Sequence, residues 1–329
     1  MRGMPYQPAL VAFAVCFACL GALLTPAGRK LVLDHPNERS LHERPVPRTG
    51  GLAILAGLAA GALLSPPGHA AALAAAFALA AVSFADDVFG LPTMVRLGAH
   101  LAAAGAILAL ELGVADVALF AALLLAVAWY TNLYNFMDGA DGLAGGMAVL
   151  GFGAYAVAAQ QSGHAPLAAT GAAIVAASTA FLILNFPPAR VFMGDVGSVP
   201  LGFLAGTLGV LGWRDGAWPL WFPLLVFAPF VCDATLTLLK RALRRERIWQ
   251  AHREHYYQRL VRSGFGHRGA AYVEYAAMAG CAAVALGVRE AGALAQAVAL
   301  AAAAAVLSAI ALWVDVRWAR HVRESGGAA

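Results

Sequence analysis

Charged residues are scarce in this chain of 329 residues, because only 12% are Asp, Glu, Lys or Arg, against roughly 25% in soluble domains. Cysteine is scarcer still, with four residues. These shortages exclude a disordered chain, a collagen-like fibre and a disulfide-stapled secreted domain. Apolar residues make up 61% of the sequence and the mean hydropathy is +0.72, so the composition indicates a polytopic membrane protein.

The four cysteines do not suggest redox chemistry. Cys16 and Cys19 form a C-x-x-C pattern, but they lie within an apolar run where helix packing is the expected role. Cys232 and Cys281 each stand alone in apolar runs.

The apolar runs predict an all-α fold with about eleven transmembrane helices, formed as a single domain over residues 1–329. Each run is long enough, or nearly so, to cross a bilayer. The last is followed by a basic tail that extends to residue 329. The predicted spans are 5–25, 49–65, 69–85, 97–113, 115–131, 143–159, 167–185, 197–212, 217–239, 270–288 and 291–314.

The positions of the basic residues predict the orientation. With the N-terminus outside, 19 of the 22 Lys and Arg residues fall on the inner side, which satisfies the positive-inside rule. We therefore expect a multi-pass membrane protein with an odd number of spans.

The acidic residues that carry chemistry cluster on the same predicted inner side, at the ends of spans. A transporter would place paired ionisable residues in the middle of the membrane. The clustering instead favours an active site on the cytoplasmic face. These acids are Asp86, Asp87, Asp138, Asp141 and Asp195.

Asp86 and Asp87 close the third predicted span. Two adjacent carboxylates at a helix C-terminus oppose the helix dipole, so a cation-binding or general-base role is more attractive than a solvated helix end. Arg96 follows closely and is a candidate contact for an anion.

The segment 132–144 combines two amides, Asn132 and Asn135, with two acids, Asp138 and Asp141. Oxygen ligands of this kind suit Mg²⁺ and phosphate. Asp141 could instead cap the next helix.

Asp195 precedes a predicted span, where a helix cap and a functional carboxylate are equally reasonable. Phe192 could pack in the core or stack on a base.

Two further segments are basic. Residues 240–269 carry nine Lys or Arg residues together with His252 and His255. The two histidines lack the partners of a zinc site, so contacts with a diphosphate are favoured, although headgroup binding by the basic residues is an alternative. Residues 34–51 form a proline-rich loop suited to anion contacts, with Arg39, His42, Arg44 and Arg48.

Taken in order, five motifs over about residues 30–270 resemble the polyprenyl-phosphate N-acetylhexosamine-1-phosphate transferases. The resemblance implies transfer of a sugar-1-phosphate from a UDP-N-acetylhexosamine to undecaprenyl phosphate, with release of UMP and a requirement for Mg²⁺, or Mn²⁺ in its place. The motifs are R-x-x-H-x-x-P-x-P-R-x-G-G at 39–51, Asp86-Asp87, N-x-x-N-F-M-D-G-x-D-G-L-A at 132–144, F-M-G-D-x-G-S at 192–198 and H-R-E-H-Y-Y-Q-R-L at 252–260.

The resemblance also implies roles for individual residues. Asp195 is then the principal metal ligand, with Asn135 near the metal. Asp86 is the expected base or orienting group for the lipid phosphate, with Asp87 in support. The remaining roles are the nucleotide site (Asp138 and Asp141), stacking on uracil (Phe192) and binding of the diphosphate or sugar (His252, Arg253 and His255).

The H-R-E-H-Y-Y-Q-R-L form is more similar to the branch that initiates O-antigen than to the phospho-N-acetylmuramoyl-pentapeptide transferases, which remain an alternative. A lipid-phosphate flippase is the alternative from another class. The donor sugar and a homodimeric state stay open, and we expect no nucleic-acid partner.

Overall fold

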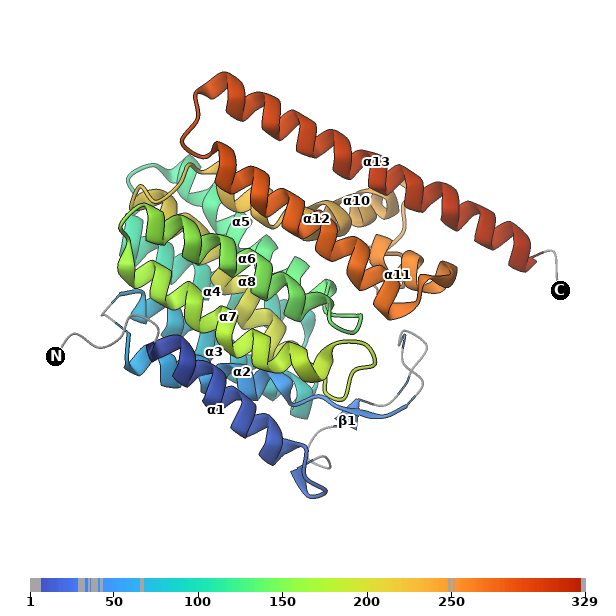
Figure 1. Ribbon diagram of the computed structural model, residues 1–329, viewed down its shortest axis with the longest axis horizontal. Coiled ribbons are helices and arrows are strands. Elements are labelled where there is room, and N and C mark those ends of the chain that lie inside the picture. The colour runs from blue at the N-terminus through green and yellow to red at the C-terminus, as the bar shows by residue number, and fades with distance from the viewer. Residues whose placement is uncertain are drawn as a thin grey trace.

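The computed structural model describes residues 7–28, 33–34, 36, 41, 44–65, 68–247, 250 and 252–326, and its regular structure is almost entirely helical (Figure 1). The exception is a two-stranded antiparallel ladder, β1 (Leu33–Asp34) with β2 (Val46–Pro47). The helices are α1 (Gln7–Leu23), α2 (Gly50–Leu63), α3 (Ala70–Phe89), α4 (Thr93–Leu112), α5 (Val117–Phe136), α6 (Leu143–Gln161), α7 (Ala165–Asn185), α8 (Asp195–Arg214), α9 (Trp221–Val226), α10 (Ala228–Leu243), α11 (Tyr256–Leu260), a π-helical turn η2 (Val261–Phe265), α12 (Gly266–Val288) and α13 (Ala293–Gly326).

The helices confirm the all-α prediction, and every predicted apolar run contains helix. Within the described residues, eight helical segments are long and apolar enough to cross a membrane, and α1 and α2 are shorter apolar helices. The count of eleven spans and their orientation remain predictions.

The run predicted over 217–239 is divided into two helices, α9 and α10, which meet at Phe227. Pro229 explains the division, because proline has no N–H and its ring clashes with the carbonyl four residues earlier. The run predicted over 270–288 begins slightly earlier, at Gly266, and a kink with non-helical backbone at Ser263 and Gly264 separates α12 from α11.

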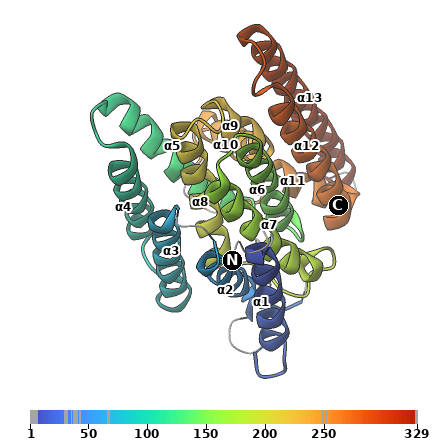
Figure 2. The ribbon, with the colours of Figure 1, turned by 60° about the vertical axis from the view of Figure 1, so that its left-hand side comes forward.

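Helix α8 forms the centre of the bundle, and almost all of its residues are buried. It packs against α5 and α3, while α6, α7, α1 and α2 pack against one another beside it. Figure 2 shows α3 and α4 at one edge of the molecule and α12 and α13 at the opposite edge. Helices α2 and α8 approach each other so closely that a Cβ on Gly51 would lie 2.4 Å from the backbone nitrogen of Gly197.

The connections gather at two ends of the bundle. At one end, Arg214 pairs with Glu111 and Arg289 donates to the carbonyl of Ala158. The other end brings together the segments that were predicted to face the cytoplasm, and β1, α11 and the C-terminal end of α13 lie on that side (right in Figure 1). The candidate site occupies this second end.

Candidate active site

Backbone pairing joins two motifs that are distant in the sequence. The N–H groups of Gly50 and Gly51 donate to the carbonyls of Phe192 and Met193 at 2.9 Å each, and the N–H of Phe192 donates to the carbonyl of Pro47 at 2.8 Å. The first four N–H groups of a helix have no partner within it, and this pairing satisfies two of those of α2. It also brings the 39–51 motif against the 192–198 motif.

Arg48 lies between two of the predicted catalytic acids. Its guanidinium forms an ion pair with Asp195 and a longer one with Asp87, at 3.4 Å. Burial lowers the pKa of Arg48, but Asp195 and Asp87 more than offset that effect and the net shift is upward. The arginine is therefore a permanent cation within an acidic cluster.

Asp86 and Asp87 have different surroundings. One oxygen of Asp86 accepts from the N–H of Leu91 at 2.7 Å, and the other pairs with Arg96 at 2.8 Å. Among the described residues, Asp87 accepts only from Arg48. Asp86 therefore holds the α3–α4 corner, while Asp87 is the less engaged carboxylate. Arg96 also approaches Asp195, at 4.0 Å.

A cavity of about 310 Å³ opens beside this cluster. Six of the predicted site residues line it, and so do residues to which the sequence analysis gave no role. The predicted ones are Arg48, Asn135, Asp138, Asp141, Phe192 and Asp195, and those not selected include Asp34, Phe136, Asn185, Tyr257, Gln258 and His267.

Asn135 and Asp138 occupy the end of α5 and the turn that follows it. The amide nitrogen of Asn135 donates to Ser198 of α8 at 3.0 Å. Burial raises the pKa of Asp138 well above its usual value; Asp195 adds to the shift, while Arg48 and the Gly194 backbone oppose it. The nearby Asp195 therefore destabilises the ionised form of Asp138 unless a cation lies close to both side chains.

Asp141 connects three segments of the site. One oxygen accepts from the N–H of Ala189 at 2.9 Å, and the other lies 3.3 Å from Nδ1 of His267. Nε2 of His267 lies 3.2 Å from the carbonyl of Leu41. Because these contacts are made across the fold, no short-range pattern pointed to His267.

Asn185 plays a similar part deeper in the cavity wall. Its oxygen accepts from the N–H of Gly142 and its amide nitrogen donates to the carbonyl of Val191, each at 2.9 Å. It had no motif signal, since a single buried Asn at a helix end is unremarkable in sequence.

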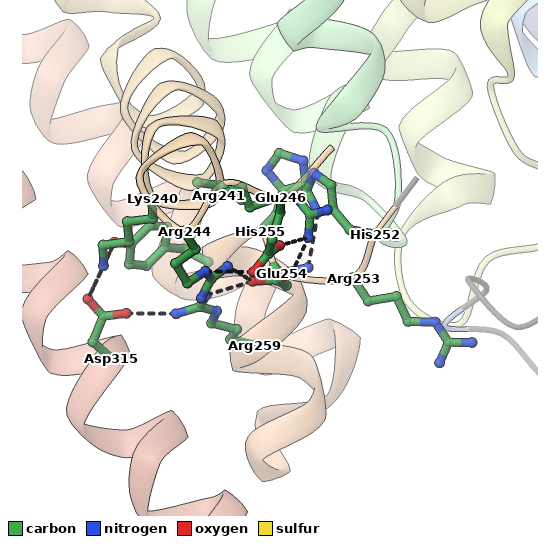
Figure 3. A network of polar contacts seen from close by, with 12 residues as sticks. Lys240, Arg241, Arg244, Glu246, His252, Arg253, Glu254, His255, Arg259 and Asp315 are labelled. Atoms are coloured by element: carbon green, nitrogen blue, oxygen red, sulfur yellow. Dashed lines mark hydrogen bonds and ion pairs between the residues drawn. The ribbon is translucent and has the colours of Figure 1, made fainter. Parts of the chain in front are cut away.

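The basic segment after α10 is largely paired within the protein. Glu254 accepts from Arg241 and Arg244, and Arg259 pairs with Asp315 of α13 at 2.7 Å (Figure 3). Although burial opposes it, the pairing with these arginines lowers the pKa of Glu254. Much of the positive charge therefore supports the local structure.

Seven predicted site residues belong to the described chain but do not line the cavity, and three of them, Asp86, Asp87 and Arg96, form the α3–α4 corner beside it. Asn132 donates to the carbonyl of Ala128 at 2.7 Å, within α5. In Figure 3 the side chain of Arg253 points away from the arginine–glutamate network. His252 and His255 are the other two. Arg39 and His42 lie outside the described residues.

The two histidines lie behind the cavity wall. Their ring centroids are 4.8 Å apart, and the ring of His255 is stacked at 5.8 Å on Tyr257, which lines the cavity. Burial, with the neighbouring His255 and Arg241, lowers the pKa of His252 to about 4. His252 is therefore neutral near pH 7. Its Nδ1 accepts from the N–H of Glu254 at 3.3 Å, which leaves Nε2–H as a donor.

The donor chemistry of the cavity fits a hard divalent cation. Asp138, Asp195 and Asn135 offer only carboxylate and amide oxygens, which Mg²⁺ and Mn²⁺ prefer. Four carboxylates face one arginine there, so an anionic diphosphate would be repelled without additional positive charge. Within the described residues no three His, Cys, Asp or Glu side chains converge as a preformed cluster, and Arg48 occupies the space between Asp87 and Asp195.

Parts of this sequence are similar to known proteins. The family model described as glycosyl transferase family 4 matches residues 69–212, a stretch that includes the Asp86-Asp87, 132–144 and 192–198 motifs.

Relatives match over a larger part of the chain. A probable undecaprenyl-phosphate N-acetylglucosaminyl 1-phosphate transferase of Bacillus subtilis is 29% identical over 296 residues, covering 81% of each chain. An undecaprenyl-phosphate alpha-N-acetylglucosaminyl 1-phosphate transferase of Yersinia pestis is 28% identical over 73% of this chain and 72% of its own. A phospho-N-acetylmuramoyl-pentapeptide-transferase of Anoxybacillus flavithermus is 43% identical, but over only 32% of each chain.

Proposed function

We propose that this chain, which is similar to glycosyl transferase family 4 over residues 69–212 and to undecaprenyl-phosphate N-acetylglucosaminyl 1-phosphate transferases over most of its length, transfers N-acetylhexosamine-1-phosphate from a UDP-sugar to undecaprenyl phosphate. UMP is the second product. The lipid-linked sugar then starts the synthesis of O-antigen or another surface polysaccharide. We place the enzyme in the bacterial inner membrane, with its site on the cytoplasmic face.

The observation that carries this proposal is the acid-rich cavity at one end of an apolar bundle. Asp195 and Asp138 face Arg48 there, beside the aromatic side chain of Phe192. An arginine can bind phosphate oxygens in a bidentate manner, and an exposed aromatic ring can stack on a base. The apolar helices around the cavity suit a lipid carrier.

The proposed cofactor is Mg²⁺, with Mn²⁺ as an alternative, held chiefly by Asp195 with Asn135 nearby. When bound, such a cation neutralises phosphate charge and helps to align the attacking and leaving oxygens. The protein contributes Arg48 and Arg96 as fixed cations for the diphosphate, with Phe192 stacked on uracil. Asp138 and Asp141 then line the nucleotide site, and Arg39 and His42 belong to the same anion-binding loop as Arg48.

For the lipid phosphate, the proposed base or orienting group is the Asp86-Asp87 pair. Asp86 was the first choice from sequence, but both of its oxygens are engaged, by Leu91 and Arg96. Asp87 has fewer partners among the described residues. The geometry therefore favours Asp87 as the carboxylate that receives a proton or orients the phosphate, with Asp86 supporting the corner.

The proposed branch is the O-antigen-initiating type. The full-length relatives above are named as N-acetylglucosaminyl 1-phosphate transferases, which supports UDP-N-acetylglucosamine as the first donor to try. The pentapeptide transferases match only a third of the chain, which makes them the weaker alternative. A flippase would need no chemistry at this cavity.

The test uses purified protein in detergent with Mg²⁺, undecaprenyl phosphate and a panel of UDP-N-acetylhexosamines. UMP release and the mass of the lipid product are measured for the wild type, Asp195→Ala and Asp87→Asn. We expect UMP only when both substrates are present, and a loss of about 100-fold or more in the variants. A folded protein that binds undecaprenyl phosphate but releases no UMP with any donor would contradict the proposal and favour the flippase.

A further inference from the structure

Asp233 on α10 is a buried carboxylate that lies outside the cavity lining. Its side chain is almost fully enclosed, and each of its hydrogen-bond partners among the described residues is a donor. One oxygen accepts from the N–H of Tyr256 at 3.0 Å and from the hydroxyl of Thr237 at 3.2 Å, and the other accepts from the N–H of Tyr257 at 2.9 Å. Such a carboxylate is an acceptor only.

The remaining partner of Asp233 is the ring of His255, whose Nδ1 lies 3.0 Å from the first oxygen. Because a carboxylate cannot donate, the proton between them belongs to Nδ1. Nε2 of His255 is then left either as an acceptor or, in the imidazolium form, as a charged donor.

The neighbouring His252 has the opposite arrangement. Its Nδ1 accepts from the N–H of Glu254, so its proton lies on Nε2. The two rings, 4.8 Å apart and side by side in Figure 3, thus present different chemistry. The difference originates in the partner of each Nδ1, a carboxylate for His255 and a backbone N–H for His252.

The environment of His255 leaves the ring little freedom. It is stacked on Tyr257 at 5.8 Å and on Phe136 at 6.2 Å, and both of these residues line the cavity. The N–H of Tyr257 is held by the same carboxylate as the His255 ring. A single side chain on α10 therefore orients both the histidine and the cavity wall in front of it.

We propose that Asp233 is a positioning residue, which fixes the ring of His255 with its proton on Nδ1 and, through His255 and the N–H of Tyr257, holds the cavity wall that faces the donor. This proposal rests on the proposed transferase function. Asp233 itself touches no substrate. Its contribution reaches the reaction only through His255 and Tyr257.

The first experiment measures the imidazole ¹⁵N shifts of His255 in the wild-type protein, with His255→Gln used to assign its signals. We expect a protonated Nδ1 in the wild type. A neutral ring with its proton on Nε2 would overturn the proposal. This measurement needs no activity, so it decides the Asp233–His255 pairing even if no UDP-sugar is turned over.

The second experiment is a double-mutant cycle on kcat/KM with Asp233→Asn and His255→Gln. The Asn variant keeps one oxygen, which can still accept from the N–H of Tyr257, but its amide then faces Nδ1 of His255 and the N–H of Tyr256, which both need an acceptor. We expect a loss of about 10- to 100-fold from Asp233→Asn, as for other residues that orient a functional histidine. In the His255→Gln background the further loss should be small.

Thr237→Val is the matched control. It removes another donor to the same Asp233 oxygen and leaves the His255 contact intact, so its activity should stay near that of the wild type. Equal losses from Asp233→Asn with and without His255 would show a merely structural role and overturn the proposal. If Asp233→Asn does not fold, the wild-type ¹⁵N measurement still decides. If the wild-type protein were inactive with every donor, that result would contradict the proposed function but not the Asp233–His255 pairing.

Discussion

At the scale of single residues, Gly194 shows how a backbone conformation positions the site. Its φ of 69° and ψ of 173° belong to a region that is essentially restricted to glycine. A Cβ there would lie 2.7 Å from Cγ of Arg48, so an added methyl group would push the guanidinium away from Asp195.

Gly194→Ala should therefore lower stability by about 1–3 kcal/mol and activity by about 100-fold, because misplacing a binding group by about 1 Å has that effect. Gly113 is a matched control, since its φ of 75° and ψ of −176° are similar and a Cβ there would meet nothing within 4 Å. Gly113→Ala should show the strain in thermal unfolding but retain activity. Equal activities of the two variants would contradict this reasoning.

His252 gives a prediction on pH at the same scale. Its pKa of about 4 in the folded protein lies below the ordinary value of 6.5. Between these two values the unfolded chain binds more protons, so the free energy of unfolding should fall as the pH is lowered from 6.5 toward 4. Denaturation in detergent at pH 7 and pH 5 measures this effect. His252→Asn should show a smaller difference between the two pH values, and an unchanged difference would contradict the assignment.

At the scale of elements, the α3–α4 corner depends on Asp86. This carboxylate caps the chain at Leu91 and pairs with Arg96, whereas Asp87 makes only the 3.4 Å contact with Arg48 among the described residues. Asp86→Ala should therefore destabilise the protein by about 1–2 kcal/mol, and Asp87→Ala by less. Thermal unfolding of both variants tests the difference. A larger loss from Asp87→Ala would show that the corner is held in another way.

The same scale shows where sequence reasoning was sufficient and where it was not. The apolar runs predicted helix correctly, because burial of backbone polar groups in a membrane requires internal hydrogen bonds. The division at Phe227 was missed, although Pro223 and Pro229 were visible, because prolines are tolerated within membrane helices. His267 and Asn185 were missed as cavity residues because their partners lie on segments distant in sequence.

At the scale of the whole molecule, the basic residues predict that the cavity end faces the cytoplasm. Gly163 belongs to the opposite set of connections, and Arg245 follows α10 on the cavity side. In a variant whose four native cysteines are replaced, Gly163→Cys should react with a membrane-impermeant maleimide in intact cells. Arg245→Cys should react only after permeabilisation. The reverse pattern would invert the predicted topology.

The sequence by itself predicted the helices, their apolar character, the resemblance to known transferases and most of the acids at the cavity, because composition and short motifs record local requirements. Only the tertiary structure decided how those acids are used. It engaged Asp86 in a corner, left Asp87 with fewer partners, placed Arg48 between two carboxylates and set Asp233 behind His255. The protonation and orientation of these side chains depend on which groups from distant parts of the sequence lie within about 3 Å of them. The packing of the helices sets those distances, and no single segment of the sequence determines them.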